Sequence, residues 1–320
     1  MELHARRHGS SHSFPPSRRC LCCITRNFLQ IGMVCNITNT TYTTNSTCRV
    51  DTLEGLAYCP VFLLGFFLNA AALRAFFAKR GSWTDTHIYM LNLAIADSTL
   101  ILFLPLRIYN AFICLPVNHV CTFLIFTHYI NMYASILTTT AISVQRYLVI
   151  RFPLQARSWR KKKEVAFAVC LILWGLILTI SAIFHKDNHP EKLSTCYERC
   201  KNIHLSPVFI VIMVVCGYLA PLLIVVFCSS RIISILLKVD DKSEEKKRTI
   251  GIVTANMIVF IFCYTPIHVG FVVNYEPPVN WQFERLPVHV YLHVAEWIAS
   301  TNCCFDSVSY SFLLMRFFRK

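Results

Sequence analysis

Charged residues are scarce in this sequence, and no polar stretch within it is long enough to form a separate soluble domain. Asp, Glu, Lys and Arg make up 15% of the 320 residues, whereas 55% are hydrophobic and the mean hydropathy is +0.50. In water such a chain would expose large apolar surfaces, which soluble domains avoid. We therefore predict a protein that is embedded in a membrane.

Several catalytic and transport signatures are also absent. The sequence has no HExxH and no GxSxG motif, which argues against a zinc protease and a serine hydrolase. Asp306 lies in CCFDSV and lacks the glycine-flanked setting of an intramembrane aspartyl protease. No lysine lies between Lys247 and Lys320 to form a retinal Schiff base, and no internal repeat indicates a repeat-built transporter. We predict that the protein is not an enzyme and keep a transporter or channel only as an alternative.

Seven apolar runs dominate the rest of the chain, and each is long enough to cross a bilayer as a helix. The predicted fold is an all-α membrane protein, a seven-transmembrane helix bundle over residues 53–313. Residues 1–52 are expected to form an external tail, and residues 314–320 the end of a short amphipathic eighth helix. The runs cover approximately residues 53–78, 87–113, 119–150, 165–185, 206–238, 248–274 and 287–313.

Positive charges predict the orientation of this bundle. The formal net charge is +14, but Lys and Arg cluster in short connections on one side of the bundle, so we predict no nucleic-acid partner. Cytoplasmic loops of membrane proteins carry this excess of Lys and Arg. The basic segments are Lys79-Arg80, Arg151 to Lys163, Lys238 to Arg248 and Arg316 to Lys320.

The segment before the first run carries the signals of an external tail. Asn36, Asn39 and Asn45 each begin an Asn-X-Ser/Thr acceptor for N-glycosylation. We predict a multi-pass protein of the plasma membrane with an extracellular N-terminus. Residues 1–32 hold five arginines and no convincing signal peptide. Our hypothesis is that translation starts at Met33, which would leave this stretch out of the mature protein.

Four polar residues inside the apolar runs have two possible roles. Asp97, Ser135, Asn302 and Asp306 offer oxygen atoms, which are the ligands that hard cations prefer. Polar groups in a bilayer are costly unless they pair or line a hydrated cavity. The same four residues are equally consistent with a hydrated polar network between helices, and both interpretations stay open on spacing alone.

Arg107 lies two residues after Pro105, near the external end of the second run. One interpretation is an anchor for an acidic ligand, because a guanidinium binds carboxylate or phosphate through paired donors. The alternatives are a snorkelling arginine or one neutralised by Glu296 of the seventh run, itself a candidate ligand-site residue. Six amphipathic residues suit a pocket wall, although core packing explains each equally well: His128, Tyr129, Met132, Tyr133, Tyr264 and His268.

The third run places two polar residues at opposite membrane boundaries. His128 and Arg146 are 18 positions apart, which is about five helical turns and roughly 27 Å, so they share one face. We predict that His128 faces an external cavity and that Arg146 faces the cytoplasm. Pro221 and Pro266 lie within the fifth and sixth runs and predict a kink in each helix.

Together these features resemble the rhodopsin-like (class A) G protein-coupled receptors. Within that family, the LPLR, ANMIVFIFCYTPIHVGF and NCCFD segments are most similar to the lipid- and metabolite-sensing branch near the purinergic receptors. The matching residues are Gly65 to Asn69, Leu93 with Asp97, Cys121, Gln145-Arg146-Tyr147, Trp174, Pro221, Phe260 with Cys263 and Pro266, and Asp306 with Tyr310.

The resemblance implies a disulfide and an ion site. It implies a bond between Cys121 and Cys196, with Cys200 either competing for that bond or pairing with Cys48. It also implies an allosteric Na⁺, and no other cofactor, held by the four oxygen-bearing residues named above.

At the cytoplasmic end, the resemblance assigns coupling to a heterotrimeric G protein to Arg146, Tyr147 and Tyr310. Gln145 stands where the family usually has an aspartate, and Tyr264 where it usually has a tryptophan. The implied function is a receptor for an anionic lipid or small metabolite, such as a lysophosphatidylinositol-like lipid or an aromatic carboxylate. A nucleotide receptor of the purinergic type is the alternative.

Overall fold

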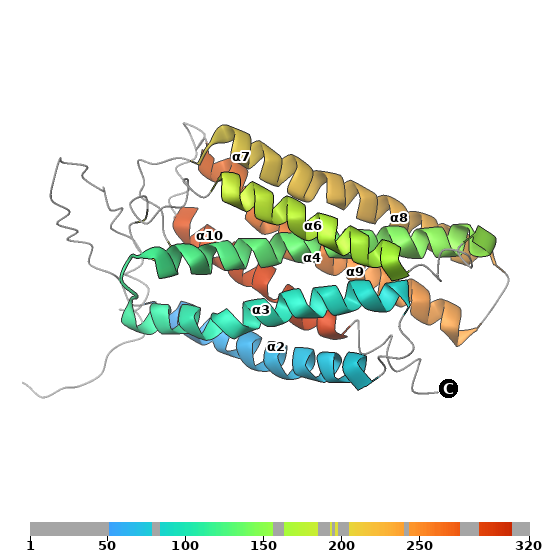
Figure 1. Ribbon diagram of the computed structural model, residues 1–320, viewed down its shortest axis with the longest axis horizontal. Coiled ribbons are helices and arrows are strands. Elements are labelled where there is room, and N and C mark those ends of the chain that lie inside the picture. The colour runs from blue at the N-terminus through green and yellow to red at the C-terminus, as the bar shows by residue number, and fades with distance from the viewer. Residues whose placement is uncertain are drawn as a thin grey trace, which may run out of the picture. The chain divides into compact units, whose positions relative to one another are not determined.

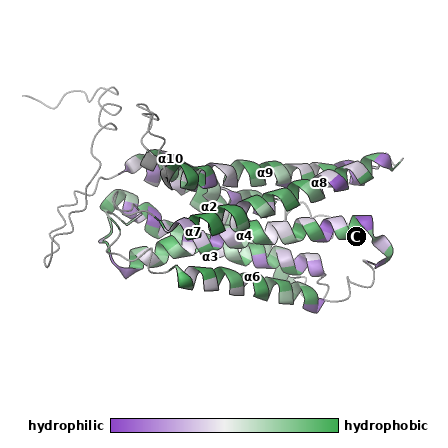
Figure 2. Cartoon of the chain, turned by 90° about the horizontal axis from the view of Figure 1, so that it is seen from above, coloured by the Kyte–Doolittle hydropathy of each residue, from purple (hydrophilic) through white to green (hydrophobic). Residues whose placement is uncertain are grey.

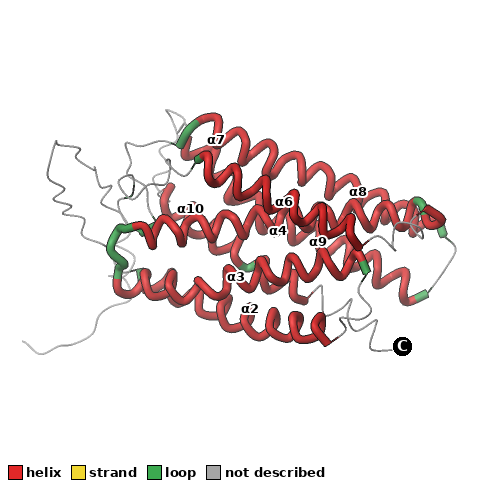
Figure 3. The backbone as a smooth tube through the Cα atoms, in the orientation of Figure 1, coloured by secondary structure: helices red, strands yellow, loops and turns green. Residues whose placement is uncertain are grey.

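The computed structural model describes residues 51–78, 84–155, 163–184, 193, 196–197, 205–239, 243–275 and 288–308. Within these ranges the chain forms long helices joined by short connections, and no β-strand is present (Figure 1 and Figure 3). The helices are α2 (Thr52–Ala78), α3 (Asp85–Ile113), α4 (His119–Arg151), α6 (Lys163–Ile183), α7 (Pro207–Val211), the π-helix η4 (Ile212–Leu219), α8 (Ala220–Lys238), α9 (Glu244–Tyr275) and α10 (Val288–Ser300).

The helices coincide with the predicted apolar runs. Helices α2, α3, α4, α6 and α9 each cover one run, while α7, η4 and α8 form one continuous span from Pro207 to Lys238. These six spans are long and apolar enough to cross a membrane. Helix α10 lies in the seventh run and is followed, after a turn at Thr301, by helical residues 302–308. The predicted all-α architecture is confirmed for the described residues.

Some predictions concern residues outside the described ranges and stay predictions. They are the glycosylation acceptors Asn36, Asn39 and Asn45, the hypothesis about residues 1–32, the pairing of Cys48 and Cys200, the coupling role of Tyr310 and the eighth helix at residues 314–320.

Burial separates the inner helices from those that face lipid. In the most apolar 18-residue window, 61% of the residues are buried in α3 and in α4, against 17% in α6. Helices α3 and α4 therefore fill the interior, whereas α6 presents most of its side chains outward. Hydrophobic residues run along the helices and hydrophilic residues gather towards the helix ends (Figure 2). This distribution suits helices whose central turns lie in hydrocarbon.

Buried polar side chains fix the register of α4 against its neighbours. Helix α4 packs against α3, α6, η4 and α8. Trp174 of α6 donates to the Asn92 side-chain oxygen at 2.8 Å, and Asn92 of α3 donates to the Thr138 hydroxyl of α4 at 2.9 Å. Asn131 of α4 donates to the backbone carbonyl of Ala96 in α3. Because buried donors must be paired, sliding α3 or α4 by one turn would break at least two of these bonds at once.

Large side chains fill the space between α4 and α9. Phe260 and Tyr264 of α9 pack with Met132 and Tyr133 of α4 in one buried cluster. Pro266 lies inside α9 and has no N–H to donate to the preceding turn. Its own carbonyl accepts a hydrogen bond from the hydroxyl of Tyr291 at 2.9 Å, which ties this point of α9 to α10.

Gly217 of η4 lies directly against the Tyr133 ring, and this contact yields a prediction. A Cβ atom at position 217 would lie 2.5 Å from Cε1 of that ring. The ring has little room to move, because Tyr133 is buried and its hydroxyl bonds to His268 at 3.0 Å. Gly217→Ala is therefore expected to lower the free energy of unfolding by about 1–3 kcal/mol through overpacking. The melting temperature of the purified protein in detergent measures this change.

Gly175 of α6 is the matched control, since nothing lies within 4 Å of a Cβ placed there. Gly175→Ala should be neutral or stabilising by up to about 1 kcal/mol, because alanine favours a helix more than glycine does. Equal effects at the two positions would contradict the close packing of Gly217 against Tyr133.

Candidate functional site

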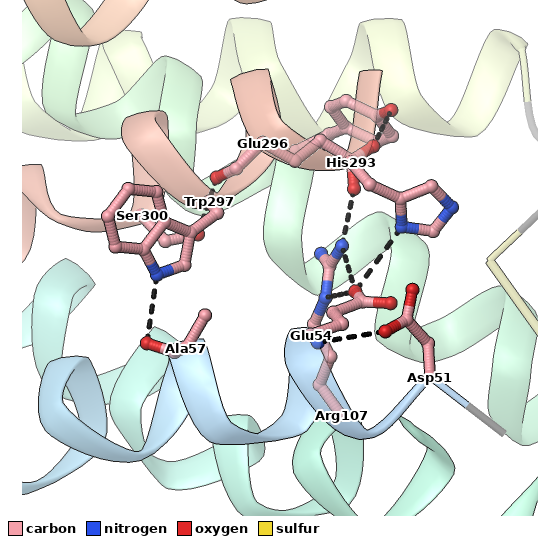
Figure 4. A network of polar contacts seen from close by, with 9 residues as sticks. Asp51, Glu54, Ala57, Arg107, His293, Glu296, Trp297 and Ser300 are labelled. Carbon is pink, nitrogen blue, oxygen red and sulfur yellow. Dashed lines mark hydrogen bonds and ion pairs between the residues drawn. The ribbon is translucent and has the colours of Figure 1, made fainter. Parts of the chain in front are cut away.

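The centre of the candidate site is Arg107, whose side chain is buried near the C-terminal end of α3. Its Nε and Nη2 atoms donate to Oε1 of Glu54 in α2 at 3.2 and 3.1 Å. Nη2 also donates to Oε2 of Glu296 in α10 at 2.6 Å. Figure 4 shows the guanidinium between these two carboxylates. One cation therefore bridges three helices, and its charge is compensated by two acidic groups.

Aromatic rings lie beside the guanidinium as well. Its carbon atom lies 4.6 Å from the centre of the Tyr58 ring and 4.5 Å from that of Tyr197. Such cation–π contacts are strongest where water is excluded. Burial raises the pKa of the Tyr197 phenol to about 12, so this ring stays neutral at physiological pH. Among the described residues, Nη1 of Arg107 finds no hydrogen-bond partner.

The two carboxylates are held in different ways. Glu54 lies in the first turn of α2, where the side chain of Asp51 caps the helix by accepting from the backbone N–H groups of Leu53 and Glu54. Its Oε1 atom also lies 3.3 Å from Nδ1 of His293. Glu296 instead accepts from the Tyr129 hydroxyl at 2.9 Å. The predicted contact between Arg107 and Glu296 is thus part of a larger network.

The six predicted pocket residues fall into two groups. Tyr129 and His128 adjoin the arginine network, and their rings contact one another edge-on. Met132, Tyr133, Tyr264 and His268 lie deeper, in the buried contact between α4 and α9. Core packing is observed for the four deeper residues. A role in a ligand pocket stays a prediction for all six.

His268 of α9 uses one ring nitrogen within its own helix and the other to contact α4. Nδ1 lies 2.7 Å from the carbonyl oxygen of Tyr264, which can only accept, so Nδ1 carries the proton. Nε2 is hydrogen-bonded to the Tyr133 hydroxyl of α4 at 3.0 Å. The ring also stacks on Tyr218 with 4.3 Å between ring centres. These contacts hold the imidazole ring in place near Pro266 of α9.

A small cavity contains three of the four predicted ion ligands. Asp97, Ser135 and Asn302 line it together with His128. The Ser135 hydroxyl donates to Oδ1 of Asp97 at 3.3 Å, whereas Oδ2 of Asp97 is buried without a hydrogen-bond partner among the described residues. An unpartnered carboxylate oxygen beside a hydroxyl and an amide is a donor set that suits a hard cation. The residues present therefore fit the sodium ion that the resemblance implies.

Asp306 lies at a second cavity, nearer the C-terminal end of α4. It accepts a hydrogen bond from Asn302 and so joins the first cavity to the second, which Arg146 and Asn256 also line. Gln145 stands at the usual aspartate position, and its amide donates to Oδ2 of Asp85 in α3 at 2.9 Å. The ring of Tyr147 contacts Phe227 of α8 at 5.8 Å between ring centres.

The predicted disulfide between Cys121 and Cys196 is present, with 5.1 Å between the Cα atoms. Cys121 lies in the first turn of α4, and the side chain of Asn118 caps that turn by accepting from the N–H groups of Val120 and Cys121. Cys114 is disulfide-bonded as well. The sequence pattern did not single out Cys114.

Four residues of the arginine network were not predicted: Glu54, Tyr58, Tyr197 and His293. One signal was available, since Glu54 is an acidic residue within an apolar run, and ionisable groups in such runs are functional candidates. The other three residues belong to types that occur widely at helix ends, and only the folded arrangement brings them to Arg107.

Comparison with known proteins gives a consistent result. The model of the family described as 7 transmembrane receptor (rhodopsin family) matches residues 68–310. Mouse lysophosphatidic acid receptor 4 is 33% identical over 296 residues, covering 86% of this chain and 79% of the relative. Mouse G-protein coupled receptor 35 is 31% identical over 80% of this chain and 83% of its own. Mouse G-protein coupled receptor 55 is 28% identical over 83% of this chain and 87% of its own.

Proposed function

Because the chain belongs to the rhodopsin family of seven-transmembrane receptors, we propose that it is a plasma-membrane receptor for an acidic lipid or small metabolite and that it activates heterotrimeric G proteins. An extracellular N-terminus is part of the proposal. It is supported by the three glycosylation acceptors that precede α2 and by the basic connections on the opposite side.

The observation that carries the ligand class is the buried guanidinium of Arg107. A cation held among aromatic rings near the external end of α3 suits a carboxylate or phosphate head group. No described residue accepts a hydrogen bond from Nη1, so this atom has a donor to offer. Two relatives bear names that mention lysophosphatidic acid, which is an acidic lysophospholipid. An apolar tail would then lie among the helices or in the adjoining lipid.

The experiment is agonist-dependent nucleotide exchange on purified G proteins in membranes that contain the receptor. Oleoyl lysophosphatidic acid, lysophosphatidylinositol, kynurenate and ADP are suitable probes. Arg107→Lys keeps the charge but loses the planar pair of donors, and it is expected to weaken an active acidic probe about tenfold, or about 1.4 kcal/mol. Lys163→Gln, an exposed residue of α6, is the control. Unchanged potency of Arg107→Lys at equal surface level would remove Arg107 from the pocket.

For the cytoplasmic side, we propose that Arg146, Tyr147 and Tyr310 contact the G protein when α9 moves outward about Pro266. The position of Arg146 at the cavity shared with Asn256 of α9 supports this role. Activation of the receptor is then a shift between two conformations of the bundle, in which no covalent bond forms or breaks.

We also propose that Asp97, Ser135, Asn302 and Asp306 hold an allosteric Na⁺. Replacing choline chloride by sodium chloride at equal ionic strength is expected to raise the melting temperature by about 3 °C, because a bound ion stabilises the folded state by mass action. Asp97→Asn removes the charge and should abolish this difference. A sodium effect of the same size in Asp97→Asn would place the ion elsewhere.

A further inference from the structure

Glu54 contacts Arg107 through an unusual arrangement of atoms. The Nε and Nη2 donors of Arg107 point along one edge of the guanidinium, and a carboxylate that pairs with this edge normally places one oxygen on each donor. Here both donors reach the same oxygen, Oε1, at 3.2 and 3.1 Å. His293 approaches that oxygen too, at 3.3 Å. Oε1 therefore accepts from two nitrogens and has a third beside it, none of them at short range.

Glu296 is bound more tightly to the same guanidinium. Its Oε2 atom accepts from Nη2 at 2.6 Å, and its Oε1 atom accepts from the Tyr129 hydroxyl at 2.9 Å. Each of its oxygens has its own donor, and the shorter distance is that of a strong charge-assisted bond. Of the two carboxylates, Glu54 is therefore the one that an incoming anion would displace more easily.

The charges make such a displacement necessary. The network contains two carboxylates and one guanidinium in direct contact. An acidic ligand bound to Arg107 with both glutamates in place would bring three negative groups around one positive group. The repulsion among these negative groups is strong, because the dielectric constant in a buried site is low and screens charges poorly.

We propose that Glu54 is an internal ligand, which occupies the anion-binding edge of Arg107 in the resting receptor and is replaced there by the acidic head group of the agonist. The incoming group is a carboxylate or a phosphate, because these can place one oxygen on each of Nε and Nη2. The displaced Glu54 keeps a partner in His293, which already lies within reach on α10 (Figure 4). Only the identity of the displacing group as an agonist rests on the proposed function. The anion-binding edge of Arg107 does not depend on that function.

The test uses small anions as probes of the purified full-length receptor in detergent. Glu54→Ala removes a CH₂–COO⁻ group, which has the size of acetate. Without added anion this variant is expected to melt about 5 °C below wild type, and sodium acetate at 100 mM should recover at least half of that difference, since binding to the folded state stabilises it. The same measurement with inorganic phosphate in place of acetate shows whether the edge of Arg107 prefers a phosphate or a carboxylate.

Three comparisons make the result specific. Acetamide has the shape of acetate without its charge and should not stabilise Glu54→Ala. Sodium chloride at equal ionic strength should not either. Glu164→Ala, which removes an exposed glutamate of α6, should respond to acetate no more than wild type does. Equal stabilisation of Glu164→Ala and Glu54→Ala, or of Glu54→Ala by acetamide and acetate, would overturn the proposal.

Glu54→Gln covers the case in which Glu54→Ala does not fold. Its amide keeps the size of the glutamate but lacks the charge, so acetate and phosphate should displace it at lower concentration than they displace Glu54. We expect a stabilisation by either anion that clearly exceeds that of wild type, and equal shifts would overturn the proposal. This test involves no agonist. If the anions stabilise the Glu54 variants but none of the acidic probes activates the receptor, the proposed ligand class is refuted and the role of Glu54 as an internal ligand still stands.

Discussion

Arg107→Met is expected to melt about 10 °C below the wild-type receptor, because it leaves Glu54 and Glu296 without their cation. Removing one partner of a buried ion pair costs about 3–5 kcal/mol, and here one guanidinium serves two carboxylates. Methionine keeps much of the apolar stem, so lost packing contributes less than lost charge. The melting temperature of the purified protein and its amount at the cell surface measure the effect.

Charge compensation distinguishes this explanation from a packing defect. Adding Glu54→Gln and Glu296→Gln to Arg107→Met removes the two uncompensated charges and should recover more than half of the lost melting temperature. Adding Glu164→Gln instead alters an exposed glutamate and should recover none. A triple variant no more stable than Arg107→Met would contradict the ionic origin of the effect.

Loss of the disulfide between Cys121 and Cys196 is expected to be the second large effect. The bond closes a loop across a sequence separation of 75 residues, and the loop-entropy relation gives about 4 kcal/mol for that length. Helices α4 and α6 lie within this loop, and in a membrane they restrict the unfolded chain even without the disulfide. We therefore expect Cys121→Ser to lower the free energy of unfolding by roughly 2–4 kcal/mol. Thermal unfolding and surface expression are the measurements.

Cys216→Ser is the matched control, since Cys216 is an exposed free cysteine of η4. It should change stability by less than about 0.5 kcal/mol. The double variant Cys121→Ser/Cys196→Ser should be no less stable than either single variant, because all three lack the same bond. A double variant that loses the sum of the single effects would mean that the two cysteines act independently.

The fold was predictable because membrane spans leave a direct signal in the sequence. Backbone groups in hydrocarbon must bond within their own helix, so each span requires an uninterrupted apolar run. The predicted resemblance to rhodopsin-like receptors, and to their lipid- and metabolite-sensing branch, is confirmed by the family match and the relatives. Motifs such as Gln145-Arg146-Tyr147 and Asp306 carried that resemblance.

The surroundings of Arg107 were predictable only in part. Glu296 was recognised as a possible partner because a buried arginine requires an acid and few acids lie within the runs. Glu54 was not assigned to Arg107, since 53 positions separate the two residues and no periodicity relates the faces of α2 and α3. Tyr197 lies in a connection between helices, where spacing predicts no contact at all. The contacts that neutralise the arginine depend on how the helices are packed and rotated.

Helix α10 is held on two sides at once. Glu296 attaches it to Arg107, and Tyr291, five residues earlier, attaches it to the carbonyl of Pro266. Five residues of α-helix turn the direction of the side chain by about 140°, so the two attachments leave the rod on nearly opposite sides. A roll of α10 about its own axis that lengthens the contact with Arg107 must therefore also shift Tyr291 against Pro266 of α9. The orientation of α10 therefore couples the arginine network to α9 at Pro266.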